Sequence, residues 1–351
     1  MTNNAISADG RALFIGGTGV ISTAVCRRAL ECGWQVTLLN RGSRPGLAPV
    51  GARCITADIH DEAAVASLLA GERFDVAVDF IAFTEADVQR DMRLFDGRVG
   101  QYIFISSASA YQKPLAALPI TESTPLANPY WQYSRDKIAC EDTLLARYRK
   151  DGFPVTIVRP TNTYCAARPI VALHGAQGRW QPLARILAEK PSIIPGDGTA
   201  LWTATHADDF AVGFVGLMGN PHALGGAVHI TTDEAMTWDQ IYTVMADAMG
   251  RPLHAVHISS EFLAECGRAA GYDFEGMLLG DKVANVRFDN TKIRRLVPEF
   301  SPKISMAQGL RETVRYFLSH SEEQTPDPAF DAWCDRVLAA REAALSAFRA
   351  G

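Results

Sequence analysis

The 351 residues suffice for one large α/β unit with a smaller lobe, or for two domains of ordinary size. Hydrophobic residues at 48% and charged residues at 21% lie near globular averages, which argues against a disordered or fibrous chain. The formal net charge of -5, without a block of Lys and Arg, argues against a dedicated nucleic-acid binder, because binding to phosphates needs clustered cations.

The seven cysteines include no CxxC pair and lie mostly in apolar segments, which predicts reduced thiols and a cytoplasmic protein. The amino-terminal stretch MTNNAISADG lacks a charged region followed by an apolar one, and no run of about 18 apolar residues occurs. We therefore expect neither secretion nor a membrane span.

Short apolar runs alternate with helical patterns in the first half of the chain, as expected of βαβ units and a parallel sheet. The predicted strands cover 12–15, 35–40, 53–56, 75–79, 102–106 and 155–158. The predicted helices between them cover 20–32, 61–70, 85–96 and 131–149. This order predicts a Rossmann-type, doubly wound α/β fold.

The pattern loosens after Pro160, where Gly and Pro become frequent, and this predicts a smaller α/β substrate lobe. A helix over 206–218 and a strand over 226–231 return the chain to the sheet, and helices are expected over 236–249, 306–319 and 327–349. The predicted dinucleotide-binding domain is 1–162 with the return segment 204–232. The predicted substrate lobe is 163–203 and 233–351.

A glycine loop, ALFIGGTGVIS, joins the first strand to the first helix. A helix amino terminus offers free N–H groups and a positive dipole end, and glycine lets a pyrophosphate approach the backbone. Ser22 stands where a third small residue would pack helix on strand. The predicted dinucleotide contacts are Gly16, Gly17, Thr18, Gly19, Val20 and Ile21.

The end of the second strand, LLNRGSR, predicts which dinucleotide binds. Asn40 replaces the acid that would bind a ribose 2′-hydroxyl, while Arg41 and Arg44 offer charged donors for a 2′-phosphate. NADP is therefore favoured and NAD stays possible; solvated loop arginines are the alternative. Asp58, beside Ile59, is a candidate for the adenine amino group or, equally, a helix cap.

The stretch NPYWQYSRDK offers two tyrosines and one lysine at the start of a predicted helix. Residues four apart share a helix face, so Tyr133 is the close partner of Lys137, and Tyr130 is not. A nearby ammonium favours the phenolate and is expected to lower the pKa of Tyr133 towards the working pH of an acid/base catalyst. The alternative is a buried tyrosine with a lysine reaching solvent.

Together with the glycine loop, the motifs SSASAY, YSRDK, VRPTN, GDG with HADD, and FDNTKIRRL resemble the short-chain dehydrogenase/reductase superfamily over nearly the whole chain. The similarity is to its extended branch of NAD(P)-dependent epimerases, dehydratases and reductases. It implies that Ser107 binds the reacting oxygen, Tyr133 transfers a proton and Lys137 also binds the nicotinamide ribose. It implies further cofactor contacts at Ile81, Ala82, Ser106 and Pro160, and substrate contacts at Ser107, Ala108, Ser109, Tyr133, Asn162 and Trp202.

Trp202 departs from the family pattern, because nucleotide-sugar enzymes of this branch commonly carry an arginine there. A planar apolar ring cannot donate hydrogen bonds to a diphosphate. A free sugar, sugar acid, polyol or small aromatic ketone therefore competes as substrate. The aromatic residues that could stack on it are Tyr130, Trp131, Trp180 and Trp202, with core packing as the alternative.

Other polar clusters predict no site. His254 and His257 would point to opposite faces of a strand, so no metal is expected. Asp208 and Asp209 are interpreted as capping carboxylates of a helix start. The terminal segment 319–351 is predicted to form an amphipathic helix on the substrate lobe.

The leading hypothesis is an NAD(P)-dependent oxidoreductase or epimerase acting on a secondary alcohol or ketone of a sugar-like molecule. One alternative is a binding protein without catalysis, since the GGT loop and LLNRG also resemble chloroplast stem-loop RNA-binding relatives of the same branch. Another is a dinucleotide-sensing regulator. The resemblance also implies a homodimer through the helices beginning near 85 and 131.

Overall fold

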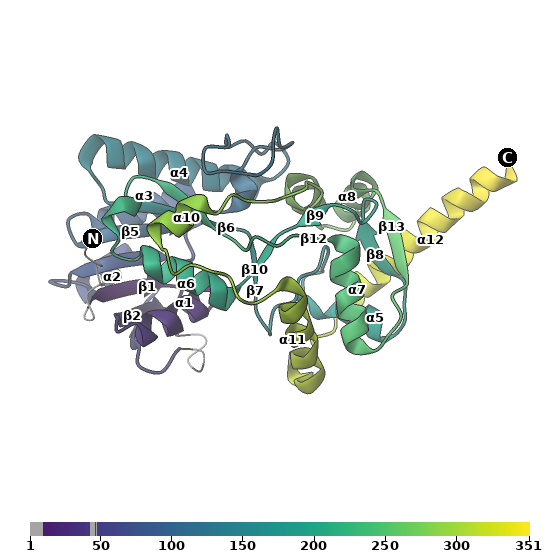
Figure 1. The fold of residues 1–351 in the computed structure, drawn as a ribbon, viewed down its shortest axis with the longest axis horizontal. Helices are drawn as coiled ribbons and strands as arrows, with labels where there is room; N and C mark the ends of the chain where they lie inside the picture. The colour runs from purple at the N-terminus through teal and green to yellow at the C-terminus, as the bar shows by residue number, and fades with distance from the viewer. Residues whose placement is uncertain (1–9, 43–45, 47) are drawn as a thin grey trace.

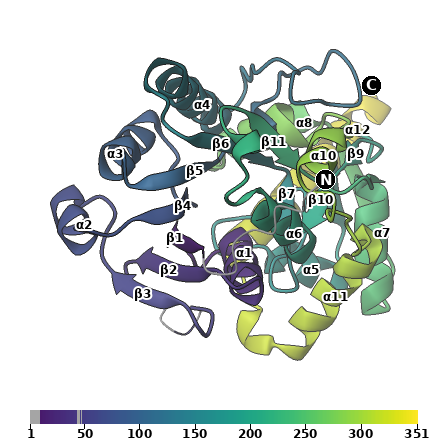
Figure 2. The ribbon, with the colours of Figure 1, turned by 60° about the vertical axis from the view of Figure 1, so that its left-hand side comes forward.

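A seven-stranded parallel sheet forms the centre of the computed structural model, which describes residues 10–42, 46 and 48–351. The strand order is β11-β6-β5-β4-β1-β2-β3, and winding reverses between β1 and β4, as in Rossmann-type sheets (Figure 2). Its strands are β1 (Arg11–Ile15), β2 (Gln35–Asn40), β3 (Arg53–Thr56), β4 (Phe74–Asp79), β5 (Val99–Ile105), β6 (Val155–Pro160) and β11 (Ala227–Ile230). The predicted fold class and its strands are confirmed.

Helices cover both faces of this sheet (Figure 2). One face packs against α1 (Val20–Glu31) and α6 (Ala207–Leu217), and the other packs against α2 (Glu62–Leu68), α3 (Glu85–Phe95) and α4 (Gln132–Asp151). Successive strand side chains point to opposite faces, so Phe14 joins the first core and Ile15 the second. Burial on both faces explains why β1 is apolar along most of its length.

The rest of the chain builds a second region from short strands and further helices (Figure 1). The strands are β7 (Asn162–Tyr164), β8 (Ser192–Pro195), β9 (Leu201–Trp202), β10 (Ala204–His206), β12 (Met236–Thr237) and β13 (Ala255–Ile258). The helices are α5 (Trp180–Leu187), α7 (Trp238–Met249), α8 (Ser260–Arg268), α9 (Phe274–Met277), α11 (Met306–Ser319) and α12 (Pro328–Ala350). The short helix α10 (Thr291–Leu296) instead returns to the sheet, where Ile293 joins the core shared with α6 and β11. The division of the chain at residue 162 stays a prediction.

The terminal helix α12 packs on this region only through its first turns (Figure 1). Phe330, Trp333 and Val337 are buried against a cluster that includes Phe274, whereas Phe348 is 86% exposed. The predicted packing of the terminal segment is therefore correct for the first part of α12 and wrong for its end, which projects from the body. None of the described helices is both long and apolar enough to cross a membrane.

Candidate functional site

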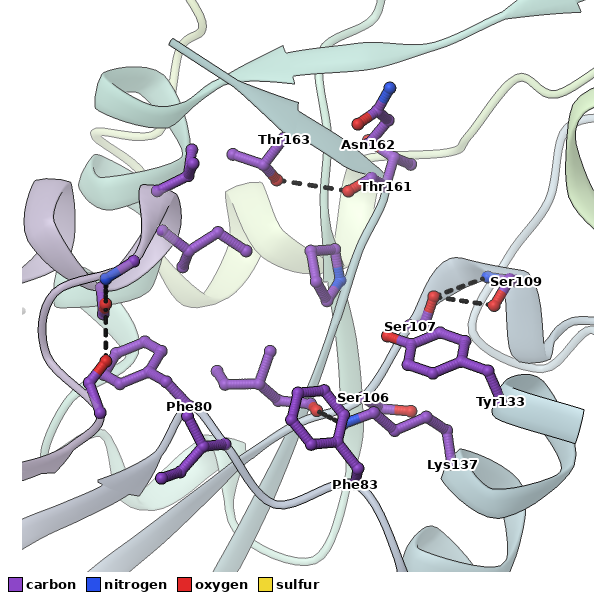
Figure 3. Close-up of a pocket in the computed structure, with 18 of the residues that line it drawn as sticks. Phe80, Phe83, Ser106, Ser107, Ser109, Tyr133, Lys137, Thr161, Asn162 and Thr163 are labelled. Carbon is purple, nitrogen blue, oxygen red and sulfur yellow. Dashed lines mark hydrogen bonds between the residues drawn. The ribbon is translucent and has the colours of Figure 1, made fainter. Parts of the chain in front are cut away.

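A cavity of about 1000 Å³ lies at the carboxyl ends of β1, β5 and β6, where the strand order reverses. Ligands of doubly wound folds bind at such reversal points. Most of the residues predicted for the site form its wall, and Figure 3 shows several of them. They are Gly16, Thr18, Gly19, Val20, Ile21, Asn40, Arg41, Asp58, Ile59, Ile81, Ser106, Ser107, Ala108, Ser109, Tyr133, Lys137, Pro160, Asn162 and Trp202.

Two predicted cofactor residues that the structure describes are not part of that wall. Gly17 is buried, and a Cβ there would lie 2.5 Å from Cδ2 of Leu38, so its cofactor contact stays a prediction. Ala82 is buried and its carbonyl oxygen accepts a hydrogen bond from Lys137, so it orients the lysine instead. Arg44 lies outside the described residues.

The glycine loop has the geometry that a pyrophosphate requires. Gly16 has a φ of +79°, and a Cβ there would lie 2.6 Å from Cγ2 of Ile81. The Ser22 hydroxyl accepts from the Gly19 N–H at 2.7 Å and donates to the Gly16 carbonyl at 2.9 Å, which closes the loop on α1. The first turn of α1 carries no acidic residue, so its positive end stays available to an anion. These residues fit a dinucleotide.

Arg41 is exposed on the cavity wall, at the end where the adenosine is expected to bind. Asn40 precedes it and accepts a hydrogen bond from the Gly42 N–H at 3.0 Å, which shapes the turn. Asp58 accepts from the His60 N–H at 3.0 Å and also lines the cavity. Asp58 thus stabilises a turn, while its position also permits contact with an adenine.

Ser107, Tyr133 and Lys137 meet at the opposite end (Figure 3). Tyr133 and Lys137 lie one helical turn apart on α4, with the lysine Nζ 5.8 Å from the centre of the tyrosine ring. Ser107 follows β5 and lies beside the Tyr133 phenol, whose pKa it lowers, and its hydroxyl lies 2.9 Å from the Ser109 hydroxyl. A phenol, a serine hydroxyl and a buried cation are therefore adjacent.

The prediction that the pKa of Tyr133 is lowered is wrong for the protein without bound ligands. Burial raises the pKa of Tyr133, the neighbouring Ser107 hydroxyl opposes this, and the negative charge of Asp281 adds to the rise. The Lys137 ammonium donates to the carbonyl oxygens of Ala82 and Ile105, both at 2.7 Å. Burial lowers the pKa of Lys137 to about 8, so this cation stabilises the phenolate less than its spacing predicted.

The four aromatic residues proposed as a stacking surface have different surroundings. Trp131 lies on the wall with its ring centre 4.9 Å from that of Tyr133. Trp202 also reaches the wall, but it is 3% exposed and stacks on Trp238. Trp180 stacks on Phe317 within the core, and Tyr130 is exposed away from the wall. Core packing therefore accounts for Trp180 and for most of the Trp202 surface.

The remaining polar clusters behave as structural features. Asp209 accepts hydrogen bonds from the N–H groups of Lys303 and Ile304, and both Asp208 and Asp209 lie in the first turn of α6. His257 pairs with Asp239 at 2.8 Å. Within the described ranges, no group of three or more His, Cys, Asp or Glu side chains could hold a metal ion.

Several wall residues were not predicted from the sequence. Phe83 follows the predicted pair Ile81 and Ala82 directly, and its ring centre lies 4.6 Å from Nζ of Lys137, so the motif there could have indicated it. Nine others reach the cavity through long-range folding, and of these Phe288 alone belongs to a motif quoted above, FDNTKIRRL. They are His60, Arg168, His174, Arg179, Met277, Asp281, Lys282, Val286 and Phe288.

Comparisons with known proteins agree with this geometry. The family model described as "NAD dependent epimerase/dehydratase family" matches residues 12–230. A 2′-dehydrokanamycin reductase of Streptomyces kanamyceticus is 30% identical over 255 residues, 73% of this chain and 71% of that protein. The chloroplast stem-loop binding protein of 41 kDa b of Arabidopsis thaliana is 26% identical over 259 residues, 70% of this chain and 65% of that protein.

A solved structure is similar over most of the chain. It is a dTDP-glucose 4,6-dehydratase of Streptomyces venezuelae with NAD bound, superposed with a TM-score of 0.69 at 22% identity. The match covers 89% of this chain and 98% of that one. At this identity the likeness concerns the fold.

Proposed function

Because the chain belongs to the NAD-dependent epimerase/dehydratase family, we propose that it is an NAD(P)-dependent oxidoreductase acting on a secondary alcohol or ketone of a sugar-like molecule. The observation that carries this proposal is the meeting of Ser107, Tyr133 and Lys137 on the wall that also holds the glycine loop. A dinucleotide on that loop would extend towards the three side chains. Hydride transfer and proton transfer would then occur at one place.

The three side chains divide the proton chemistry between them. When bound, the dinucleotide supplies or accepts the hydride. Ser107 donates a hydrogen bond to the substrate oxygen, and Tyr133 gives that oxygen its proton when a ketone is reduced. Lys137, whose ammonium donates to the carbonyl groups of Ala82 and Ile105, would bind the nicotinamide ribose with its remaining N–H.

We propose that ketone reduction is the working direction. Burial raises the pKa of Tyr133, which keeps the phenol protonated at neutral pH, and a proton donor must start in that form. The similarity to a 2′-dehydrokanamycin reductase supports the same direction. Internal epimerisation of a sugar with the same three residues is the alternative.

The test of this proposal is the loss of absorbance of NADPH or NADH with a panel of ketosugars, together with the dinucleotide released on denaturing freshly purified protein. We expect little retained dinucleotide and substrate-dependent oxidation of added NADPH. Stoichiometric retained dinucleotide without net oxidation would instead indicate epimerisation. Failure to bind either dinucleotide would contradict the enzyme proposal.

A second candidate, binding of structured RNA without catalysis, is favoured by the similarity to the chloroplast stem-loop binding protein. Filter binding with stem-loop RNA over a salt series tests it, because phosphate-driven binding weakens steeply with salt. We expect no salt-sensitive binding, since the net charge is -5 and the chain has no block of cations. Tight, salt-sensitive binding would favour this candidate.

Arg41 provides a prediction about cofactor choice. Arg41→Gln is expected to weaken NADPH binding by about tenfold at low salt, because a charged donor to the 2′-phosphate is lost. NADH lacks that phosphate and should bind within about twofold of the parent value. Fluorescence titration of both dinucleotides measures this. Equal weakening of NADPH and NADH binding would indicate that Arg41 instead stabilises the turn after β2.

The resemblance also implies a homodimer through α3 and α4, which we retain as a proposal. Sedimentation equilibrium on the full chain tests it against the monomer mass of 38.1 kDa.

A further inference from the structure

Three cations gather on the cavity wall beyond Tyr133, at the end formed by the second region. Arg168 and Arg179 come from the connection between β7 and α5, and Lys282 comes from the connection after α9. Arg168 is exposed to the cavity, Arg179 is half-buried, and Lys282 is 7% exposed. His174 lies on the same wall. These side chains meet only in the folded protein.

The connection that carries the two arginines is firmly held. Ile170, Val171, Ala172 and Leu173 between them are buried. An isolated bridge joins Cys165 to Arg168. Nη1 of Arg179 donates to the Pro169 carbonyl at 3.0 Å, which fixes one edge of the guanidinium and leaves donors on its other edges. The Arg179 guanidinium and the backbone that carries Arg168 are thus positioned before any ligand binds.

Arginines elsewhere in the fold that lose contact with water have acidic partners. Arg90 pairs with two aspartates, Arg159 pairs with Glu141, and Arg185 pairs with Asp331 and Asp335. Among the described residues, neither Arg168 nor Arg179 forms an ion pair with a carboxylate. Arg179 is partly desolvated without an anion, which is costly, and Arg168 presents a second guanidinium to the same cavity, so an anion from outside the chain would complete this cluster.

Lys282 adds only part of a positive charge at neutral pH, because burial and the neighbouring cation Arg179 lower its pKa to about 7. Its Nζ donates to the Ala172 carbonyl at 2.7 Å, and the negative charge nearby is that of Asp281, which is shared with Lys113. Burial and the neighbouring cation Arg168 lower the pKa of Arg179 to about 9. The net charge at this end of the cavity is therefore positive at neutral pH.

We infer that Arg168 and Arg179 bind an anionic group of the substrate, a carboxylate or a phosphate. This inference rests on the proposed function and adds the substrate class to it. Paired guanidinium groups match the two oxygens of such a group and would turn the ketone towards Tyr133. The same cations disfavour a polycationic aminosugar, so the substrate differs in charge from kanamycin-like molecules.

The test is calorimetric titration of the full chain saturated with NADPH, using five probes of different charge. The probes are D-glucuronate, glucose 6-phosphate, UDP-glucose, glucose and kanamycin. We expect the anionic probes to bind at least about tenfold more tightly than glucose, and kanamycin not to bind. The anionic probe that binds most tightly identifies the anionic group of the substrate as a carboxylate, a phosphate monoester or a diphosphate.

Variants connect any preference to the two arginines. Arg168→Gln and Arg179→Gln should each weaken the best anion about tenfold, leaving NADPH affinity within about twofold. Arg336→Gln, on an exposed surface of α12, removes the same charge and should change neither value. Unchanged anion affinity in both cavity variants, or glucose or kanamycin binding as tightly as the anions, would overturn the inference.

A failure of the proposed function can be distinguished from a failure of the anion-binding inference. If NADPH does not bind, the same titrations without it still measure anion preference and its dependence on the arginines. Arg168 is exposed, so its variant should fold even if the half-buried Arg179 variant does not.

Discussion

Replacing Tyr133 by Phe is expected to lower the turnover of ketone reduction by about 100-fold or more, with dinucleotide affinity preserved. The substitution removes one oxygen atom and keeps the ring, which packs beside Trp131 and Phe83. Only the phenol hydroxyl beside Ser107, the proposed proton donor, is lost. Steady-state kinetics of NADPH oxidation, with fluorescence titration of NADPH, measure both quantities.

A matched control lies three residues earlier. Tyr130 is 41% exposed and is not part of the cavity wall, so Tyr130→Phe should leave turnover within about twofold of the parent. A fully active Tyr133→Phe variant would remove the proposed mechanism. Equal losses in the two variants would indicate disturbance of the start of α4 rather than loss of a proton donor.

The raised pKa of Tyr133 predicts the pH dependence of the reaction. A donor works only while protonated, so kcat/KM for reduction should fall as pH rises through the pKa of Tyr133. Because burial moves that pKa above its ordinary value of about 10, the rate should stay level through neutral pH. A pH series from 6 to about 11 tests this. A fall of kcat/KM centred near pH 7 would instead show that Lys137 lowers the pKa of the Tyr133 phenol.

The parts of the site that the sequence predicts are those carried by local motifs. The glycine loop and the Tyr133 and Lys137 pair each depend on a spacing of a few residues within one strand-to-helix junction or one helix. Local geometry then determines where the side chains lie. The sheet follows similarly, because its buried strands are short apolar runs between clear helical patterns.

The substrate end could not be predicted because its residues meet through tertiary folding. Arg168 and Lys282 are more than a hundred positions apart in sequence, and both lie on the cavity wall. The strands β9 and β12 that shape this region have two residues each, which is too short to show a period. The stacking of Trp202 on Trp238 could not be predicted either, because nothing in the sequence around the two residues indicates that they meet.

The pKa of Tyr133 shows a further limit of sequence spacing. The interval between Tyr133 and Lys137 correctly places a cation near the phenol, but it does not reveal where the ammonium points. The carbonyl groups of Ala82 and Ile105 hold the ammonium. Burial of the phenol, which depends on the whole fold, then determines the direction of the shift.

Replacing Arg159 by Leu is expected to destabilise the protein by about 3 to 5 kcal/mol, because it leaves a buried carboxylate without its cation. Arg159 on β6 and Glu141 on α4 are 4% and 0% exposed, and they form two hydrogen bonds. Glu141 also accepts a hydrogen bond from Ser106. Urea unfolding followed by circular dichroism, analysed over its first transition, measures the loss.

Two controls separate this loss from a general effect of removing an arginine. Arg251 pairs with Glu189 at 2.9 Å on the surface, so Arg251→Leu should cost no more than about 1 kcal/mol. Combining Arg159→Leu with Glu141→Gln removes the unpaired charge and should recover part of the stability, as a double-mutant cycle would show. No recovery would mean that the arginine acts through its packing on Tyr111 instead.

The same ion pair connects stability to the site. Ser106 bonds to Glu141, and the next residue, Ser107, reaches the substrate side of the cavity. Arg159 likewise precedes Pro160 on the cavity wall. Arg159→Leu should therefore also lower turnover at temperatures where the variant remains folded, because Ser107 would be less firmly positioned against Tyr133. Unchanged turnover in the folded variant would limit the role of the pair to stability.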